Sequence, residues 1–181
     1  MKIAIAPVTP VNWPDLETLF ETPGGPAYCW CMTWRDMPGR ALAKPADRKA
    51  ALRAEVMAVR EVGLLLTAED VPGGWCSLAP TDHFRPLFKA PVESGTWSLT
   101  CLFLRRDLRG HGLSARLLTA AIDHARVEGA SALQATPVDP DSPSYRFMGF
   151  VPLFAAHGFL EVGKAGTRRH VMRLDLRDGG R

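Results

Sequence analysis

The sequence predicts an α/β fold of the α+β type, in which a mixed central sheet of about six or seven strands carries helices on both faces. Residues 97–104 are apolar except for Ser98 and Thr100, which is typical of a strand covered on both sides. From Leu113 onward the apolar residues recur at the spacing of one helix face, so a helix follows this strand and packs on the sheet. Further strand and helix patterns surround this unit.

The segments before this strand predict one strand, two helices and a hairpin. Residues 2–8 alternate like a strand, and a short helix begins at Asn12. A second helix covers residues 45–61 and has Val59 on its apolar side. The hairpin is expected to pair two apolar segments across the loop EDVPGG, whose proline and glycines are turn signals.

Three strands and another short helix are expected after the central helix. The strands cover residues 132–136, 159–162 and 170–176, and the helix covers residues 150–156. We therefore expect a single domain that spans residues 1–181, which is long enough to bury a core of its own.

Composition and charge exclude several function classes. The chain is 46% hydrophobic and 23% charged, as in ordinary globular proteins. No apolar run reaches the roughly 20 residues of a membrane helix, and the N-terminus lacks a secretory pattern, so a cytoplasmic protein without a membrane partner is expected. The net charge is only +3 and is scattered, which argues against a nucleic-acid partner. The four cysteines are expected to be reduced.

A glycine turn joins the central strand to its helix, with the sequence Arg109-Gly110-His111-Gly112-Leu113-Ser114. Glycine lets a ligand approach the main chain, and the first turn of a helix offers free amide N–H groups and the positive end of its dipole. The turn therefore predicts an anion site, and a phosphate suits it best.

Two familiar nucleotide loops do not match this turn. A Walker loop needs a lysine and a Ser or Thr after its last glycine, whereas Leu113 and Ser114 follow Gly112. A dinucleotide loop needs a third glycine and an acidic residue about twenty positions on, and this chain has Ala115 and no acid there.

A third pattern fits better. Residues 102–114 read Leu-x-Leu-x-Arg-x-x-Arg-Gly-x-Gly-x-Ser, which resembles the acetyl-coenzyme A motif of the GNAT superfamily of N-acetyltransferases. Further segments resemble one branch of that superfamily: Gly74-Trp75-Cys76, Cys29-Trp30-Cys31-Met32, Pro137-Val138-Asp139, Phe154-x-x-x-Gly158-Phe159 and residues 170–174. The predicted strand order agrees with that of the superfamily.

The resemblance implies a transferase that moves the acetyl group of acetyl-CoA directly to a primary amine of a small molecule or peptide. In the family, amides of the glycine loop hold the pyrophosphate and the edge of the preceding strand pairs with the pantetheine arm. The cofactor-binding residues would be Leu102, Phe103, Leu104, Arg109, Gly110, His111, Gly112, Leu113, Ser114 and Phe154. The alternative is a non-catalytic acyl-CoA-binding module that acts as a sensor or scaffold.

Two positions depart from the family pattern and leave the catalytic groups open. Ser114 replaces a glycine or alanine, and Phe154 stands where the family often has a tyrosine that protonates the thiolate. His83, Asp139 and Tyr145 are the candidate catalytic residues, because each lies in a segment expected near a strand end or the site. A turn-capping Asp, a solvated His and protonation by water are the alternatives.

The acceptor side is predicted less specifically. Trp30, Trp34 and Trp75, together with Tyr28, are candidates for an aromatic acceptor pocket, although tryptophans on strands more often pack in a core. Cys29 and Cys31 form an isolated Cys-x-Cys, for which packing is favoured over metal binding, so no metal is expected. The acceptor and the oligomeric state stay open, with a homodimer as one alternative.

Overall fold

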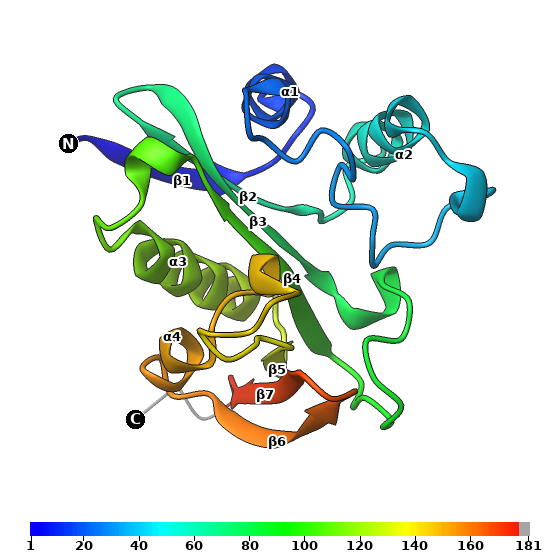
Figure 1. The fold of residues 1–181 in the computed structure, drawn as a ribbon, viewed down its shortest axis with the longest axis vertical. Coiled ribbons are helices and arrows are strands. Elements are labelled where there is room, and N and C mark those ends of the chain that lie inside the picture. The colour runs from blue at the N-terminus through cyan, green and yellow to red at the C-terminus, as the bar shows by residue number, and fades with distance from the viewer. Residues whose placement is uncertain (178–181) are drawn as a thin grey trace.

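The computed structural model describes residues 1–177, which fold around one seven-stranded sheet of order β1-β2-β3-β4-β5-β7-β6 (Figure 1). The strands are β1 (Ile3–Pro7), β2 (Gly63–Ala68), β3 (Val71–Pro80), β4 (Thr96–Leu104), β5 (Ala132–Ala135), β6 (Leu160–Ala165) and β7 (Arg169–Asp175). The α-helices are α1 (Trp13–Glu21), α2 (Pro45–Met57), α3 (Leu113–Val127) and α4 (Val151–Ala155), and the 3-10 turns are η1 (Arg40–Leu42), η2 (Thr81–His83), η3 (Arg106–Leu108) and η4 (Arg146–Met148). The predicted fold class is confirmed.

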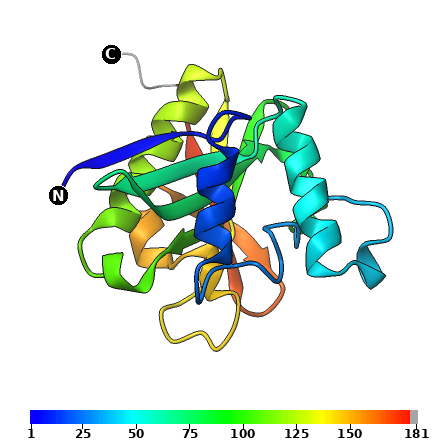
Figure 2. The same ribbon diagram turned by 90° about the horizontal axis from the view of Figure 1, so that it is seen from above.

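The helices divide between the two faces of the sheet, as Figures 1 and 2 show. One apolar cluster joins α3 and α4 to side chains such as Leu66 and Leu99, and the other joins α1 and α2 to Leu65 and Trp75. Neighbouring strand residues point to opposite faces, so a central strand must be apolar at almost every position. This explains the continuous apolar run of β4. No helix within residues 1–177 is long and apolar enough to cross a membrane.

The second helix is shorter than predicted. It ends at Met57, and Val59 is 78% exposed with φ +56°, so the expectation that Val59 packs on the apolar side is wrong. The Val59 amide donates to the Val56 carbonyl and the Arg60 amide donates to the Glu55 carbonyl, which is the hydrogen-bond pattern of a Schellman cap. A valine occupies the position where glycine is usual, so the sequence carries no glycine signal for this helix end.

The hairpin loop is also shorter than predicted. Glu69 and Asp70 alone form the turn, both with positive φ, because Ala68 already pairs with Val71. Gly73 and Gly74 lie inside β3, where an added Cβ would collide with the side chains of Leu108 and Leu104. These glycines therefore allow close packing in the strand and are not loop residues.

The sheet opens between β4 and β5, its only parallel pair within the described chain. Pairing runs from Thr96 with Ala132 to Leu99 with Ala135 and then stops, although β4 continues to Leu104. A register shift against β3 leaves Thr100 as an extra residue at this point. Residues 100–104 therefore pair with β3 on one side and present a free strand edge on the other.

An ion pair joins the last turn of α3 to the segment before β2. His124 Nε2 lies 3.0 Å from Glu61 Oε2, and the hydrogen bond with Glu61 raises the pKa of His124 above its usual value. The charge of Glu128 also raises the pKa of His124. The His124 and Trp97 rings pack edge to face, with their centroids 5.9 Å apart. Because the folded pKa is the higher one, the stabilisation is complete below the unfolded pKa of about 6.5 and is lost as pH rises through the folded pKa.

We predict that Glu61→Gln lowers the free energy of unfolding by about 1 kcal/mol or less near pH 6, and by progressively less as pH rises above the folded pKa of His124. Urea denaturation of both proteins across that pH range measures this difference. Asp123→Asn, which removes an exposed charge from the same helix, is the control and should give a difference without this pH dependence. A pH-independent effect of Glu61→Gln would contradict the assignment.

Candidate functional site

The glycine turn between β4 and α3 presents main-chain donors to solvent. Gly110 and Gly112 have φ of +80° and +72°, and an added Cβ at either position would meet no atom within 4 Å. Within the described chain the amides of Gly110, His111 and Gly112 donate no backbone hydrogen bond. Gly112 is the N-cap of α3, so the next amides also lack intrahelical partners. The turn is thus a main-chain site for an anion, reinforced by the helix dipole.

The turn is tied to the end of β4 by side chains. Arg109 Nε donates to the Leu104 carbonyl at 3.1 Å, and Arg105 Nη1 donates to the Pro72 carbonyl at 3.1 Å. Leu108 is buried against the glycine-bearing part of β3. These contacts fix the anion site at one end of the open strand edge.

A cavity of about 590 Å³ runs along that edge. Its walls come from β4, the glycine turn, α3, η4 and the start of α4. They include Leu102, Phe103, Leu104, Arg109, Ser114, Leu117, Arg146, Phe147, Gly149, Phe150 and Leu153. The cavity therefore joins the anion site to the free main-chain groups of residues 100–104.

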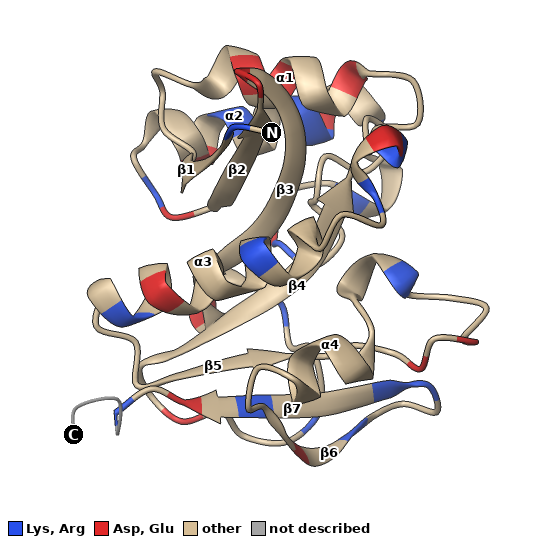
Figure 3. Ribbon diagram, turned by 90° about the vertical axis from the view of Figure 1, so that its left-hand side faces the viewer, with Lys and Arg blue, Asp and Glu red and all other residues tan. Residues whose placement is uncertain are grey.

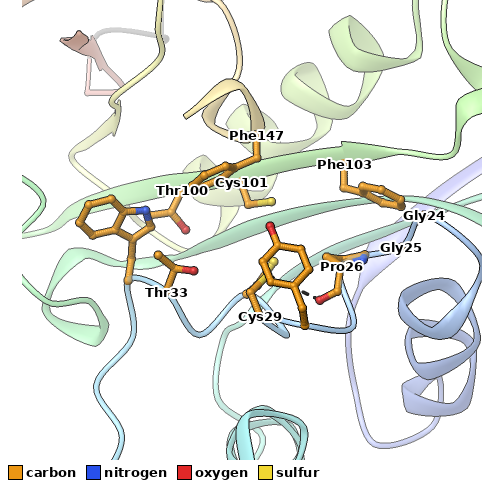
Figure 4. A pocket seen from close by; sticks show the side chains of 12 residues that line it. Gly24, Gly25, Pro26, Cys29, Thr33, Thr100, Cys101, Phe103 and Phe147 are labelled. Carbon is orange, nitrogen blue, oxygen red and sulfur yellow. Dashed lines mark hydrogen bonds between the residues drawn. The ribbon is translucent and has the colours of Figure 1, made fainter. Parts of the chain in front are cut away.

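A smaller cavity of about 140 Å³ lies between β4 and the segment at residues 24–34. Figure 4 shows Cys101 and Phe103 reaching from β4 toward the segment that carries Pro26, Cys29 and Thr33, with Phe147 approaching from η4. Phe103 and Phe147 line both cavities. The two spaces therefore meet at the open edge of β4.

Three thiols line the smaller cavity, those of Cys29, Cys31 and Cys101, and the first two are held protonated. Hydrogen bonding with Cys31 and, to a smaller extent, burial raise the pKa of Cys29. Hydrogen bonding with Cys101 raises the pKa of the buried Cys31. Trp75 Nε1 donates to Cys31 Sγ at 3.0 Å. A thiol is a nucleophile only as the thiolate, so neither Cys29 nor Cys31 is prepared for nucleophilic attack. They are packing and wall residues.

Comparison with known protein families shows which family this chain belongs to. Residues 26–150 match the model of the acetyltransferase (GNAT) family. The chain belongs to the GNAT acetyltransferase family. The match spans the glycine turn, the open strand edge and most of the walls of both cavities.

Solved GNAT structures share the fold at low sequence identity. An N-acetyltransferase from Staphylococcus aureus Mu50 is 15% identical, with a TM-score of 0.62 over 98% of this chain and 100% of that one. A putative acetyltransferase from Salmonella typhimurium, solved with its cofactor acetyl-CoA, is 15% identical with a TM-score of 0.59 over 100% and 98%. The ribosomal-protein-alanine N-acetyltransferase of Brucella melitensis is 19% identical with a TM-score of 0.59 over 96% and 99%. No curated protein matches the sequence significantly.

The structure brings most of the predicted cofactor residues together. Leu102, Phe103, Leu104, Arg109 and Ser114 line the larger cavity, and the remaining loop residues adjoin it in sequence. His111 is exposed, whereas the side chain of Leu113 is buried in the core, so only the main chain of Leu113 is open to a ligand at the turn.

Phe154 differs from the other predicted cofactor residues. It is fully buried, packs edge-on against Phe159 with ring centroids 5.2 Å apart, and does not line the cavity. Its ring lies against Gly149, where an added Cβ would come within 2.7 Å of it. The GNAT position that often holds a tyrosine is therefore a packing position in this chain.

The three predicted acceptor-site tryptophans separate into one wall residue and two core residues. Trp34 lines the smaller cavity, as does Tyr28. Trp30 is buried between Trp13 and Phe20, at centroid distances of 6.0 and 5.1 Å, and Trp75 is buried beside Phe20. We do not propose Trp30 and Trp75 as acceptor-binding residues, because side chains of α1 pack against both rings.

The three predicted catalytic residues come from different elements, and none of them lines either cavity. Asp139 is exposed and accepts a hydrogen bond from His170 Nε2 at 3.1 Å, so it is engaged at β7. His83 lies in η2 and lines neither cavity. The ring centroid of Tyr145 lies 6.4 Å from that of Phe147, which lines both cavities. Sequence reasoning missed Phe147, because nothing in a polar loop marks one phenylalanine as a cavity wall.

We predict that Gly149→Ala destabilises the protein by about 2–4 kcal/mol, because its φ of +86° with ψ of 179° is a conformation almost restricted to glycine and the added Cβ would lie 2.7 Å from the Phe154 ring. Gly129→Ala is the control for a positive φ without a collision. Gly129 has φ +79° with no atom within 4 Å of an added Cβ, so only about 1–2 kcal/mol should be lost. Chemical denaturation measures both, and equal losses would show that neither the backbone conformation nor the Phe154 ring makes Gly149 the more sensitive position.

Proposed function

We propose that the protein transfers the acetyl group of acetyl-CoA to the primary amine of a small molecule or peptide. The observation that carries the proposal is the meeting of the two cavities at the open edge of β4, with a main-chain anion site at the end of the larger one. One space suits an elongated cofactor and the other suits a small amine-bearing group.

The residues of the larger cavity fit acetyl-CoA. The free amides of residues 110–114 would hold the pyrophosphate, and the space beside Gly110 and Gly112 leaves room for it. The free edge at residues 100–104 would pair with the amide groups of the pantetheine arm, as an added strand does. Acetyl-CoA supplies an activated thioester, and a β4 amide at this edge would polarise its carbonyl.

The smaller cavity favours an amine in its neutral, nucleophilic form. No Asp, Glu, Lys, Arg or His side chain lines it within the described chain, so no carboxylate there pairs with an ammonium ion, and burial itself lowers an amine pKa. Because the Cys29 and Cys31 thiols are held protonated, direct attack by the amine is favoured over a covalent intermediate on the enzyme.

We propose Tyr28 as the proton donor to the departing thiolate. It lines the smaller cavity, and the neighbouring Cys29, followed by partial burial, raises the pKa of Tyr28, so its hydroxyl is protonated at neutral pH. Tyr28→Phe should lower kcat by about 100-fold while leaving the affinity for acetyl-CoA unchanged. If Tyr145→Phe loses kcat and Tyr28→Phe does not, Tyr145 is the donor.

Isothermal titration calorimetry with acetyl-CoA tests the cofactor site. Gly112→Ala should weaken binding by about tenfold or more, because the added methyl group projects into the space proposed for the pyrophosphate. Gly39→Ala has a similar φ of +65° and equally open surroundings, but it lies outside both cavities and should bind as the wild type does. Absence of acetyl-CoA binding at millimolar concentration would overturn the proposal.

Release of free CoA, followed with a thiol reagent across a set of amines, tests the transfer step. Amine-dependent release above background hydrolysis supports the acetyltransferase. Tight acetyl-CoA binding without turnover of any amine would instead favour an acyl-CoA sensor or scaffold. The observation behind this alternative is that the buried Phe154 lacks the hydroxyl of the tyrosine often found at its position in the family.

A further inference from the structure

Five buried side-chain nitrogens have no hydrogen-bond partner within the described chain: Trp34 Nε1, Arg35 Nε, His83 Nδ1, Arg85 Nε and Arg169 Nη1. All five come from three short segments, around residues 34, 84 and 169. The tryptophan and arginine atoms are obligate donors, and buried donors are nearly always satisfied. Their concentration in one place therefore points to a ligand that brings acceptor oxygens.

The three segments pack together around the Trp34 ring. The Arg85 amide donates to the Trp34 carbonyl at 2.8 Å, and the guanidinium groups of Arg85 and Arg169 lie 5.7 and 4.7 Å from the centroid of the Trp34 ring. Arg169 also lies 5.1 Å from the Tyr145 ring. The two aromatic rings thus hold the Arg169 guanidinium in place while its Nη1 group lacks a partner.

Arg35 is the exception within this group. Its side chain is fully in the core, where Nη2 donates to the Val62 carbonyl at 2.9 Å and the guanidinium stacks on Phe84. Burial lowers the pKa of Arg35 to about 10. We therefore treat Arg35 as a structural support of the segment and assign ligand binding to the donors of Trp34, Arg85 and Arg169.

No carboxylate of the described chain forms an ion pair with Arg85 or Arg169. Asp139 and Glu161 pair with His170, and Glu93 pairs with Arg173. Asp36 and Asp82, in the segments that carry Trp34 and Arg85, are exposed and form no ion pair with either arginine. Figure 3 shows basic residues at the start of β7 and the β6–β7 turn. Arg85 and Arg169 therefore lack a carboxylate partner within the described chain.

The donor cluster lies where an acceptor would extend from the smaller cavity. Trp34 is part of that cavity wall, and Arg169 lines a groove of about 700 Å³ between β6, β7 and residues 87–93. Strand alternation keeps Arg169 on this face, whereas its neighbour His170 faces the Asp139 side. A molecule with its amine in the smaller cavity would carry its other end toward Arg169.

We propose that the acceptor is an amine that also carries a carboxylate, such as an amino acid, and that Arg169 and Trp34, with Arg85, bind the carboxylate. This rests on the proposed acetyl transfer. The guanidinium fork matches a carboxylate, and the aromatic faces fix its orientation. Two unpaired arginines at the same place disfavour polycationic amines. Arg169 is thus a specificity-determining residue.

The test compares an amino acid with its amide, for example phenylalanine with phenylalaninamide, at equal concentrations of neutral amine. The wild type should prefer the acid in kcat/KM by about 10- to 100-fold. Arg169→Gln should remove this preference by raising KM for the acid, with acetyl-CoA affinity unchanged. Arg169→Lys, which keeps the charge without the fork, should retain part of it. Arg126→Gln is the control, because Arg126 lies on α3, pairs with Asp123 and lines none of the three cavities, so the preference should stay intact.

A binding measurement separates this inference from the activity itself. Calorimetry in the presence of CoA should show that N-acetylphenylalanine binds more tightly than its amide, and that Arg169→Gln abolishes the difference. If no amine is acetylated but this difference holds, the proposed transfer fails and the carboxylate site stands. If amines are acetylated and acid and amide behave alike in both measurements, the carboxylate site is overturned.

Discussion

The structure depends on the point at which β4 and β5 stop pairing. After Leu99 and Ala135 the two strands separate, and the extra residue Thr100 turns the rest of β4 away from its neighbour. A strand edge in the middle of a sheet leaves unpaired N–H and C=O groups that need partners. Both cavities and the glycine turn lie along this edge, so the proposed cofactor and acceptor sides both depend on one interruption in hydrogen bonding.

The acceptor side is supported by an aromatic core that does not itself contact the cavity. Trp30 and Cys31 have φ of +47° and +51°, a conformation that costs non-glycine residues about 1–2 kcal/mol each. Packing of Trp30 on Trp13 and Phe20, and the hydrogen bond from Trp75 to Cys31, hold this strained segment against β4. The buried tryptophans therefore shape the wall of the smaller cavity from behind, while Trp34 at the end of the segment reaches its surface.

Apolar packing also accounts for the departure from the family at Phe154. Its ring fills the space against Gly149, which lines the larger cavity. A hydroxyl at this buried position would need a partner of its own. The proposed proton donor to the thiolate therefore lies on the other side of β4, among the groups that line the smaller cavity.

The sequence by itself determined the central unit. The apolar run of β4, the glycines at 110 and 112 and the amphipathic face of α3 are local patterns, and each follows from backbone conformation and periodicity within a few residues. The fold class was predictable for that reason, and the resemblance of the same residues to the GNAT motif indicated the family that the comparison confirms. The anion site at the turn stays a prediction. Glycine was a less reliable guide elsewhere, since Val59 ends a helix without one and Gly73 and Gly74 lie inside a strand.

Only the tertiary structure decided which side chains meet. Trp30 and Trp34 lie in the same irregular segment, yet only Trp34 lines the smaller cavity, because α1 packs on Trp30. The donors of Trp34, Arg85 and Arg169 come from segments separated by 51 and 84 residues, so no local pattern connects them. Such contacts are set by the order and register of the strands, which a one-dimensional periodicity does not contain.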